Sequence, residues 1–213
     1  MNDPHPDQLD PLLLARLLCT RLCHDMAAPV GAVANGAELM GGDPAMVDAE
    51  TLGLLTDSAA AASLRLRTLR AAFGLRGALE AADVPRLIQG WVATRTTVMP
   101  PAPEALTRLA ADDLQVLLNL ALVAHDAALA PTTLTVTVEP GATVVMTAEA
   151  TGRGARSEQG LAEAVAGAPE GVGPRTVQGW LVGALARQRG GQVAYAEIAG
   201  GVRLTGTLPL PTG

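Results

Sequence analysis

The chain has 213 residues, of which 49% are hydrophobic but only 2% are aromatic. Its core must therefore be built from Leu, Val, Ala and Met, which suits packed helices better than a β-sandwich. The formal net charge of -6, from 15 Lys and Arg against 21 Asp and Glu, argues against a nucleic-acid-binding protein, whose balance is normally basic.

Two long helices are expected first, over residues 11–40 and 45–73. Asp10 suits the cap position, Pro11 is tolerated at the first helical position, and the Gly-Gly-Asp-Pro run at 41–44 ends the first helix. Each helix carries apolar residues spaced by threes and fours. These residues are Leu18, Leu22, Met26, Val30, Val33, Ala37 and Met40 in the first helix, and Leu52, Leu55, Ala59, Ala62, Leu66 and Leu69 in the second.

An antiparallel pair of such helices, each about 45 Å long, cannot bury both apolar stripes by itself. Two pairs can do so as a four-helix bundle. The pattern therefore predicts a homodimer. The alternative is that the pair packs on the C-terminal half of its own chain.

After a short linker at residues 74–82, the elements become shorter. Helices are expected over 83–93, 114–129, 157–165 and 174–189, and strands over 96–99, 132–139, 143–150, 192–198 and 202–208. The predicted fold class is α+β. A helical hairpin in a domain of residues 1–76 is followed by an α/β sandwich domain of residues 80–213, with helices on one face of a mixed sheet.

No run of about 18 apolar residues indicates a membrane span. The first seven residues are acidic and proline-rich, unlike the basic start of a signal peptide. Two cysteines, Cys19 and Cys23, are too few for a secreted disulfide framework. A cytoplasmic protein with no membrane partner is expected.

His24 is the main candidate for chemistry. At 100° per residue it lies about 160–200° from Leu22 and Met26, away from the apolar stripe. The acidic Asp25 adjoins it, and Pro29 lies five residues on, where it removes a helical hydrogen bond. The surrounding positions are mostly small and would let another protein approach closely. This predicted docking face consists of Arg16, Thr20, Arg21, Ala27, Ala28 and Gly31.

The segment around His24 resembles the H-box of two-component histidine kinases. That motif has a histidine, an acid, an aliphatic residue, two variable residues, a proline and an aliphatic residue, which here are His24, Asp25, Met26, Pro29 and Val30. The resemblance implies that the His24 imidazole is phosphorylated. It also implies that Asp25 orients the ring or accepts a proton.

The second half resembles the ATPase domain of the same kinases, with losses at the nucleotide site. Asn119-Leu120 looks like the N-box helix, but Val123 stands where that family places an Asn that helps to hold magnesium. The strand ending at Ala150 leads to Thr151-Gly152-Arg153-Gly154, which lacks the adenine-binding Asp. A retained fold with a lost ATP site is expected.

This combination is similar to the ChpT-type histidine phosphotransferases of bacterial phosphorelays. The resemblance implies a homodimer that carries phosphate between the receiver domain of a hybrid kinase and the receiver domains of response regulators. It also implies no cofactor or metal of its own, because the Mg²⁺ belongs to the receiver. Two alternatives remain open: an ATP-dependent autokinase, and a dimeric scaffold that binds receivers without accepting phosphate.

The pair His125-Asp126 repeats the histidine-acid sequence at the end of a predicted helix. Because Ala130 occupies the position of the H-box proline, a helix-end histidine is the favoured interpretation.

Overall fold

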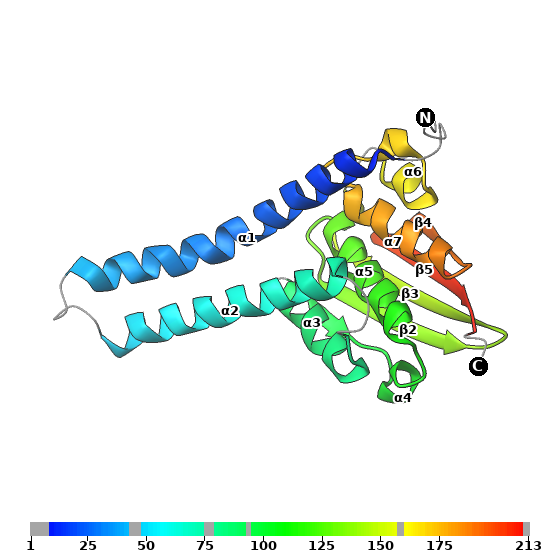
Figure 1. Cartoon of the computed structure of the whole chain (residues 1–213). Coiled ribbons are helices and arrows are strands. Elements are labelled where there is room, and N and C mark those ends of the chain that lie inside the picture. Colours follow the sequence, from blue (N-terminus) through cyan, green and yellow to red (C-terminus); the bar gives the residue numbers. More distant parts are fainter. Residues whose placement is uncertain (1–8, 43–47, 75–78, 93–94, 157–159, 211–213) are drawn as a thin grey trace.

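The computed structural model describes residues 9–42, 48–74, 79–92, 95–156 and 160–210. Its first two elements are the long helices α1 (Pro11–Gly42) and α2 (Ala49–Phe73), which pack together as an antiparallel hairpin. Figure 1 shows one end of the hairpin projecting away from a layered α/β body, against which the other end lies. Among the described residues, no helix is long and apolar enough to cross a membrane.

Side-chain caps fix where both long helices begin. The Asp10 carboxylate accepts hydrogen bonds from the backbone N–H groups of Leu12 (3.3 Å) and Leu13 (3.1 Å). Asp48 does the same for α2 by accepting from the Thr51 N–H at 2.8 Å. The expected start of the second helix at residue 45 lies outside the described residues.

The apolar stripe of α2 is wider than the hairpin alone can cover. Leu55, Ala62 and Leu69 are partly or fully buried, and Leu55 packs against Gly36 of α1. Its other half, formed by Leu52, Ala59 and Leu66 at intervals of seven residues, stays exposed. Leu52 and Leu66 retain 50% and 44% of their accessible surface. One edge of the hairpin is therefore apolar and uncovered.

The five strands form one mixed sheet in the order β1-β2-β3-β5-β4. β1 pairs parallel with β2, and every other pairing is antiparallel. The β4–β5 hairpin turns at Gly200, whose φ of 76° favours glycine. The strands are β1 (Thr97–Met99), β2 (Thr133–Pro140), β3 (Thr143–Thr151), β4 (Gln192–Ile198) and β5 (Gly201–Pro209).

Helices cover one face of this sheet, as Figure 1 shows. α5 (Ala111–Ala127) packs on β3 and β5, with α7 (Val177–Gln188) beside it; α3 (Val84–Trp91) and α6 (Leu161–Ala166) lie toward the edges. The predicted fold class, a helical hairpin followed by a mixed α/β domain, is confirmed. The division at residues 76–80 stays a prediction. Leu69 and Ala72 of α2 belong to the same hydrophobic core as α5.

Three short elements were not predicted from the sequence: η2 (Ala81–Asp83), α4 (Pro103–Leu106) and η3 (Pro169–Gly171). Helix α7 also begins at Val177 rather than at residue 174. The Thr176 hydroxyl accepts from the Gly173 N–H at 2.8 Å and donates to the Gly171 carbonyl at 2.6 Å. These bonds form a turn that delays the helix, because side-chain bonds to nearby backbone compete with helical ones.

A buried amide network joins α2, α5 and α7. Asn119, with no exposed surface, donates to the carbonyls of Ala72 and Gln115 (3.0 Å each) and accepts from Gln178 Nε2 (3.1 Å). Replacing Asn119 with Ala leaves these buried partners without their hydrogen bonds. Asn119→Ala is therefore expected to lower the free energy of unfolding by about 2–4 kcal/mol. Urea denaturation measures the loss; a change below about 0.5 kcal/mol would rank Asn119 with ordinary surface positions.

Candidate functional site

The His24 side chain projects from the middle of α1 with 84% of its surface exposed. Its Nδ1 lies 3.2 Å from Asp25 Oδ1. Because a carboxylate only accepts hydrogen bonds, a neutral imidazole in this contact carries its proton on Nδ1. The lone pair is then on Nε2, which leaves the exposed nitrogen as the nucleophile.

Asp25 is itself held from behind by Arg21, one helical turn earlier. Its Oδ2 accepts from Arg21 Nε at 2.6 Å. The two side chains are only 10% and 13% exposed, respectively. Because one carboxylate oxygen is taken by Arg21, the other is directed at His24.

Arg21 also links α1 to the end of α5. Its Nη2 forms an ion pair with Asp126 Oδ2. Burial by itself would lower the pKa of Arg21, but the adjacent carboxylates of Asp126 and Asp25 raise it above its ordinary value. The guanidinium therefore remains charged at any physiological pH.

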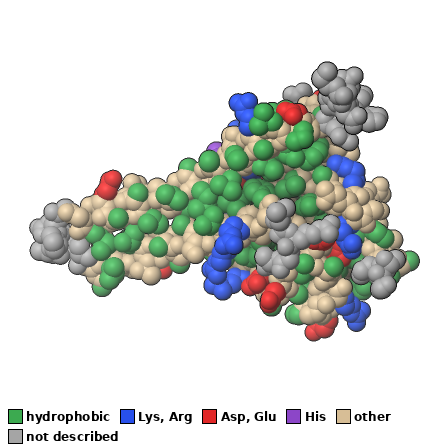
Figure 2. All heavy atoms as spheres, viewed as in Figure 1, with side chains coloured by type: hydrophobic (Ala, Val, Ile, Leu, Met, Phe, Trp, Pro, Cys, Tyr) green, Lys and Arg blue, Asp and Glu red, His purple; other side chains and the backbone are tan. Residues whose placement is uncertain are grey.

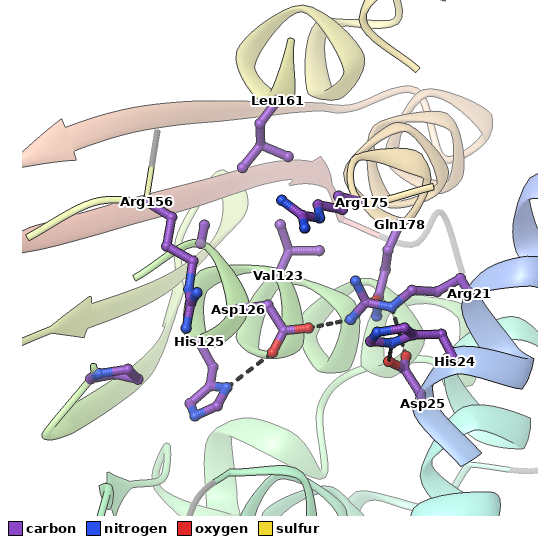
Figure 3. A pocket seen from close by; sticks show the side chains of 12 residues that line it. Arg21, His24, Asp25, Val123, His125, Asp126, Arg156, Leu161, Arg175 and Gln178 are labelled. Atoms are coloured by element: carbon purple, nitrogen blue, oxygen red, sulfur yellow. Dashed lines mark hydrogen bonds and ion pairs between the residues drawn. The ribbon is translucent and has the colours of Figure 1, made fainter. Parts of the chain in front are cut away.

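Asp126 is anchored on its other side by α3. Its Oδ1 accepts from the Trp91 indole Nε1–H at 3.0 Å and lies 3.1 Å from His125 Nδ1. The Arg65 guanidinium of α2 stacks over the Trp91 ring at 4.0 Å from its centre. Four helices therefore meet in one network behind His24, part of which Figure 3 shows.

A pocket of about 370 Å³ opens between α1 and the α/β domain, next to His24. Figure 3 shows Arg156 and Arg175 entering it from the domain side, opposite Arg21 and His24. Arg156 Nε donates to the Ala128 carbonyl at 3.1 Å. The side chains around the pocket include Arg21, His24, Asp25, Val123, His125, Asp126, Arg156, Arg175 and Gln178.

The loop at residues 151–154, which the sequence likens to the adenine loop of a kinase, is paired with a neighbouring segment. The Arg153 N–H donates to the Leu129 carbonyl at 2.9 Å, and the Leu129 N–H donates to the Gly154 carbonyl at 2.7 Å. No carboxylate stands in Thr151-Gly152-Arg153-Gly154. Val123, only 5% exposed, presents an apolar side chain to the pocket. Within the described ranges, no group of three or more His, Cys, Asp or Glu side chains could hold a metal ion.

The model of the family described as "Histidine phosphotransferase C-terminal domain" matches residues 81–199, more than half of the chain. The chain belongs to the histidine phosphotransferase family. The match covers most of the α/β domain, while the site at His24 lies on α1, outside the matched residues.

Two individual proteins support the membership in this phosphotransferase family. Protein phosphotransferase ChpT of Brucella abortus (strain 2308) is 44% identical over 72 residues, which is 34% of this chain and 34% of that protein. The aligned region thus spans about a third of the length of this curated relative. A solved structure of a bacterial phosphotransferase superposes with a TM-score of 0.73 at 26% identity, covering 93% of this chain and 98% of that one.

A histidine kinase domain from the blue-light-activated kinase EL346 of Erythrobacter litoralis also aligns. The alignment covers 94% of this chain and 95% of that domain at 15% identity, with a TM-score of 0.45.

The residues of the docking face predicted from the sequence divide into two groups. Arg16, Thr20, Ala27 and Ala28 are exposed on α1, and Gly31 is half-buried. Arg21 instead points inward, with its guanidinium between Asp25 and Asp126. The structure therefore places Arg21 within the chain's own helix junction rather than on the open face.

The site also contains residues that sequence reasoning missed. Asp126 was seen only as part of a histidine-acid pair at a helix end, and Trp91 and Arg65 were not singled out. The repeated His-Asp sequence at 125–126 was the one available signal. Nothing in the sequence spacing links it to residue 21.

The position of Asp126 predicts a pH dependence of stability. Burial by itself would raise its pKa, but His125, the charge of Arg21 and the Trp91 indole together lower the pKa below its ordinary value. Such a carboxyl stabilises the fold above the unfolded-state pKa of about 3.9, and the stabilisation is lost as the pH falls through the folded-state value. The difference in melting temperature between wild type and Asp126→Asn should be full at neutral pH and shrink below about pH 4. A difference that is constant across thermal melts from pH 3 to 7 would contradict this assignment.

Proposed function

We propose that the chain is a phosphoryl carrier in a cytoplasmic phosphorelay. His24 would accept a phosphoryl group from the receiver domain of a hybrid histidine kinase and pass it to the receiver domains of response regulators. One observation carries the proposal: an exposed imidazole whose Nδ1 meets a carboxylate, in a chain of the histidine phosphotransferase family.

The proposed step is a reversible transfer between two side chains. The Nε2 lone pair of His24 attacks the phosphorus of the receiver's aspartyl phosphate, a new N–P bond forms, and the P–O bond breaks with its electron pair going to the aspartate. The ring then carries a positive charge, which Asp25 stabilises through the Nδ1–H bond. The Mg²⁺ that neutralises the transferring phosphoryl belongs to the receiver.

Docking of the receiver is proposed on the α1 face around His24. Thr20, Ala27 and Ala28 are exposed there and carry small side chains, so a receiver's active-site edge can come close. Arg16 lies two turns before His24 on the same helix and offers a positive charge to an acidic partner. A relay contact of this kind must release its partner, which fits an interface at or below ~1,200 Å².

We propose that the chain transfers phosphate without ATP. Val123 cannot ligate a metal, and no carboxylate in Thr151-Gly152-Arg153-Gly154 is present to bind adenine. The Leu129 backbone pairs with that loop. Titration with Mg-ATP up to about 1 mM should therefore give no saturable binding, a range that covers typical nucleotide affinities.

A homodimer is proposed from the uncovered edge of the hairpin. Figure 2 shows hydrophobic side chains gathered along both helices in that view. Leu52, Ala59 and Leu66 repeat every seven residues on α2, and Val30 is 53% exposed on α1. A second hairpin would cover this surface as a four-helix bundle.

One experiment separates the proposal from its two rivals. The wild-type chain is incubated either with a phosphorylated receiver domain or with Mg-ATP alone. Acid-labile, base-stable labelling from the receiver but not from ATP is expected. Labelling in the incubation with Mg-ATP would establish an autokinase. Binding of the receiver without labelling in either incubation would establish a scaffold.

A further inference from the structure

An ion-pair network lies behind His24, and only its member Asp25 takes part in the proposed reaction. The network consists of Arg21 and Asp25 on α1, Asp126 on α5 and Trp91 on α3, and we call these four residues the clasp. Trp91 is 4% exposed, the side chains of Arg21 and Asp25 are 13% and 10% exposed, and that of Asp126 is 31% exposed. Most of the clasp therefore lies out of water, while Asp126 is partly exposed and the outer end of the clasp reaches the exposed imidazole.

Stability alone is a weak explanation for a network of this kind. Taking charges out of water is costly, and apolar side chains of similar size often stabilise a fold as well or better. Trp91 and Arg65 already supply a stacked contact at this junction. A buried charged network in such a place is better explained by a requirement for one defined geometry.

The geometry that the clasp defines ends at the reacting group. Arg21 uses Nε for Asp25 and Nη2 for Asp126, so its planar fork has one orientation while both carboxylates are in place. Asp25 in turn uses Oδ2 for Arg21 and Oδ1 for His24. Loss of the Asp126 charge would free the guanidinium to turn about its long side chain, and the Asp25 carboxylate would turn with it.

We propose that Asp126 is a positioning residue for phosphoryl transfer, which acts through Arg21 to hold the Asp25 carboxylate against Nδ1 of His24. The inference rests on the proposed carrier role of His24. The same link also fixes α1 against the end of α5, so the docking face and the α/β domain keep one relative orientation. In this role Asp126 acts through Arg21 and Asp25, and its own contact is with the Arg21 guanidinium.

The chemical consequence is a choice of tautomer. With Asp25 in place, the neutral His24 ring keeps its proton on Nδ1 and its lone pair on Nε2, the exposed nitrogen. With Asp25 displaced, the proton is free to move to Nε2, and the ring then lacks a lone pair at the attacking position. A displaced carboxylate also no longer stabilises the positive ring that forms on transfer.

The test compares two isosteric variants of one helix. Asp126→Asn removes the charge of the clasp. Asp113→Asn removes another ion-paired carboxylate of α5, which accepts from Arg189 Nε at 2.8 Å near the opposite end of the helix. Arg21→Lys serves as a second clasp variant, because it keeps the charge and loses the fork.

Two readouts are taken for each variant. ¹⁵N chemical shifts of the His24 ring at neutral pH report the tautomer without any phosphorylation, and labelling by a phosphorylated receiver reports the transfer rate. Asp126→Asn and Arg21→Lys are expected to move the proton toward Nε2 and to slow transfer about tenfold, within what misplacement of a reacting group costs. Asp113→Asn is expected to leave the tautomer and the rate at wild-type values.

Wild-type tautomer and rate in both clasp variants would overturn the proposal. Equal changes in Asp113→Asn would overturn it too, because the effect would then be general loosening of the fold. If the wild type accepts no phosphate, the carrier function fails, but the ring shifts still decide whether Asp126 positions Asp25. An unchanged tautomer in Arg21→Lys overturns the proposal even if Asp126→Asn does not fold.

Discussion

A His24→Gln variant is expected to accept no phosphoryl group from a phosphorylated receiver, while its fold and its receiver binding stay intact. Acceptance of the phosphoryl group is lost completely because glutamine has no nucleophilic ring nitrogen. The effect on the fold is small because the side chain is 84% exposed and its hydrogen bond is to the adjacent Asp25. Stability should therefore change by no more than about 0.5 kcal/mol.

The position of the label provides the control for this variant. The chain has three histidines, at positions 5, 24 and 125. His5 lies outside the described residues, and His125 is largely buried against Asp126. Mass spectrometry of the labelled wild type should place the phosphate on His24. Label on His125, or label that persists in His24→Gln, would refute the assignment of the nucleophile.

A double substitution on α2, Leu52→Arg with Leu66→Arg, is expected to convert the proposed dimer into a monomer. Leu52 and Leu66 retain 50% and 44% of their surface, so each contributes about half of the ~1.5–3 kcal/mol that full burial gives. Two-fold symmetry removes four such leucines, about 3–6 kcal/mol together, so the dissociation constant should rise by at least about 10²-fold. Light scattering during gel filtration should give twice 21.7 kDa for wild type and 21.7 kDa for the variant.

Leu54→Arg is the matched control for this experiment. Leu54 is 63% exposed, more than either substituted leucine, but it lies about 200° around the helix from Leu52. It should leave the dimer intact. A wild-type monomer at micromolar concentration, or equal disruption by Leu54→Arg, would contradict a bundle built on the uncovered edge.

The order of helices and strands and the candidate nucleophile could be predicted because their signals are local in the sequence. His24 lies two residues from both Leu22 and Met26, so spacing alone places it on a face opposite the apolar stripe. The alternation of the strands at 133–140 and 143–151 is equally local. Short elements such as α4 were missed because four residues carry too little periodicity to be recognised.

The clasp could not be predicted because its members meet only in the folded chain. Arg21 and Asp126 are 105 residues apart, and nothing in the pattern near either residue indicates the other. Arg21 was assigned to the docking face because it lies three residues before His24, close to the same helix face. The Asp126 carboxylate on α5 draws the long side chain of Arg21 the other way. Spacing on a helix gives the direction of Cβ, while the end of a flexible side chain follows its charge partners.

The most direct test of the central claim is transfer between two receivers through the chain. A phosphorylated hybrid-kinase receiver is mixed with an unphosphorylated response-regulator receiver, with wild-type chain, with His24→Gln or with neither. Phosphate is expected to reach the second receiver rapidly with wild type only, and a transient label should appear on His24. If the second receiver is labelled equally without the chain, or if the chain binds both receivers and never carries the label, the chain is not a phosphoryl carrier.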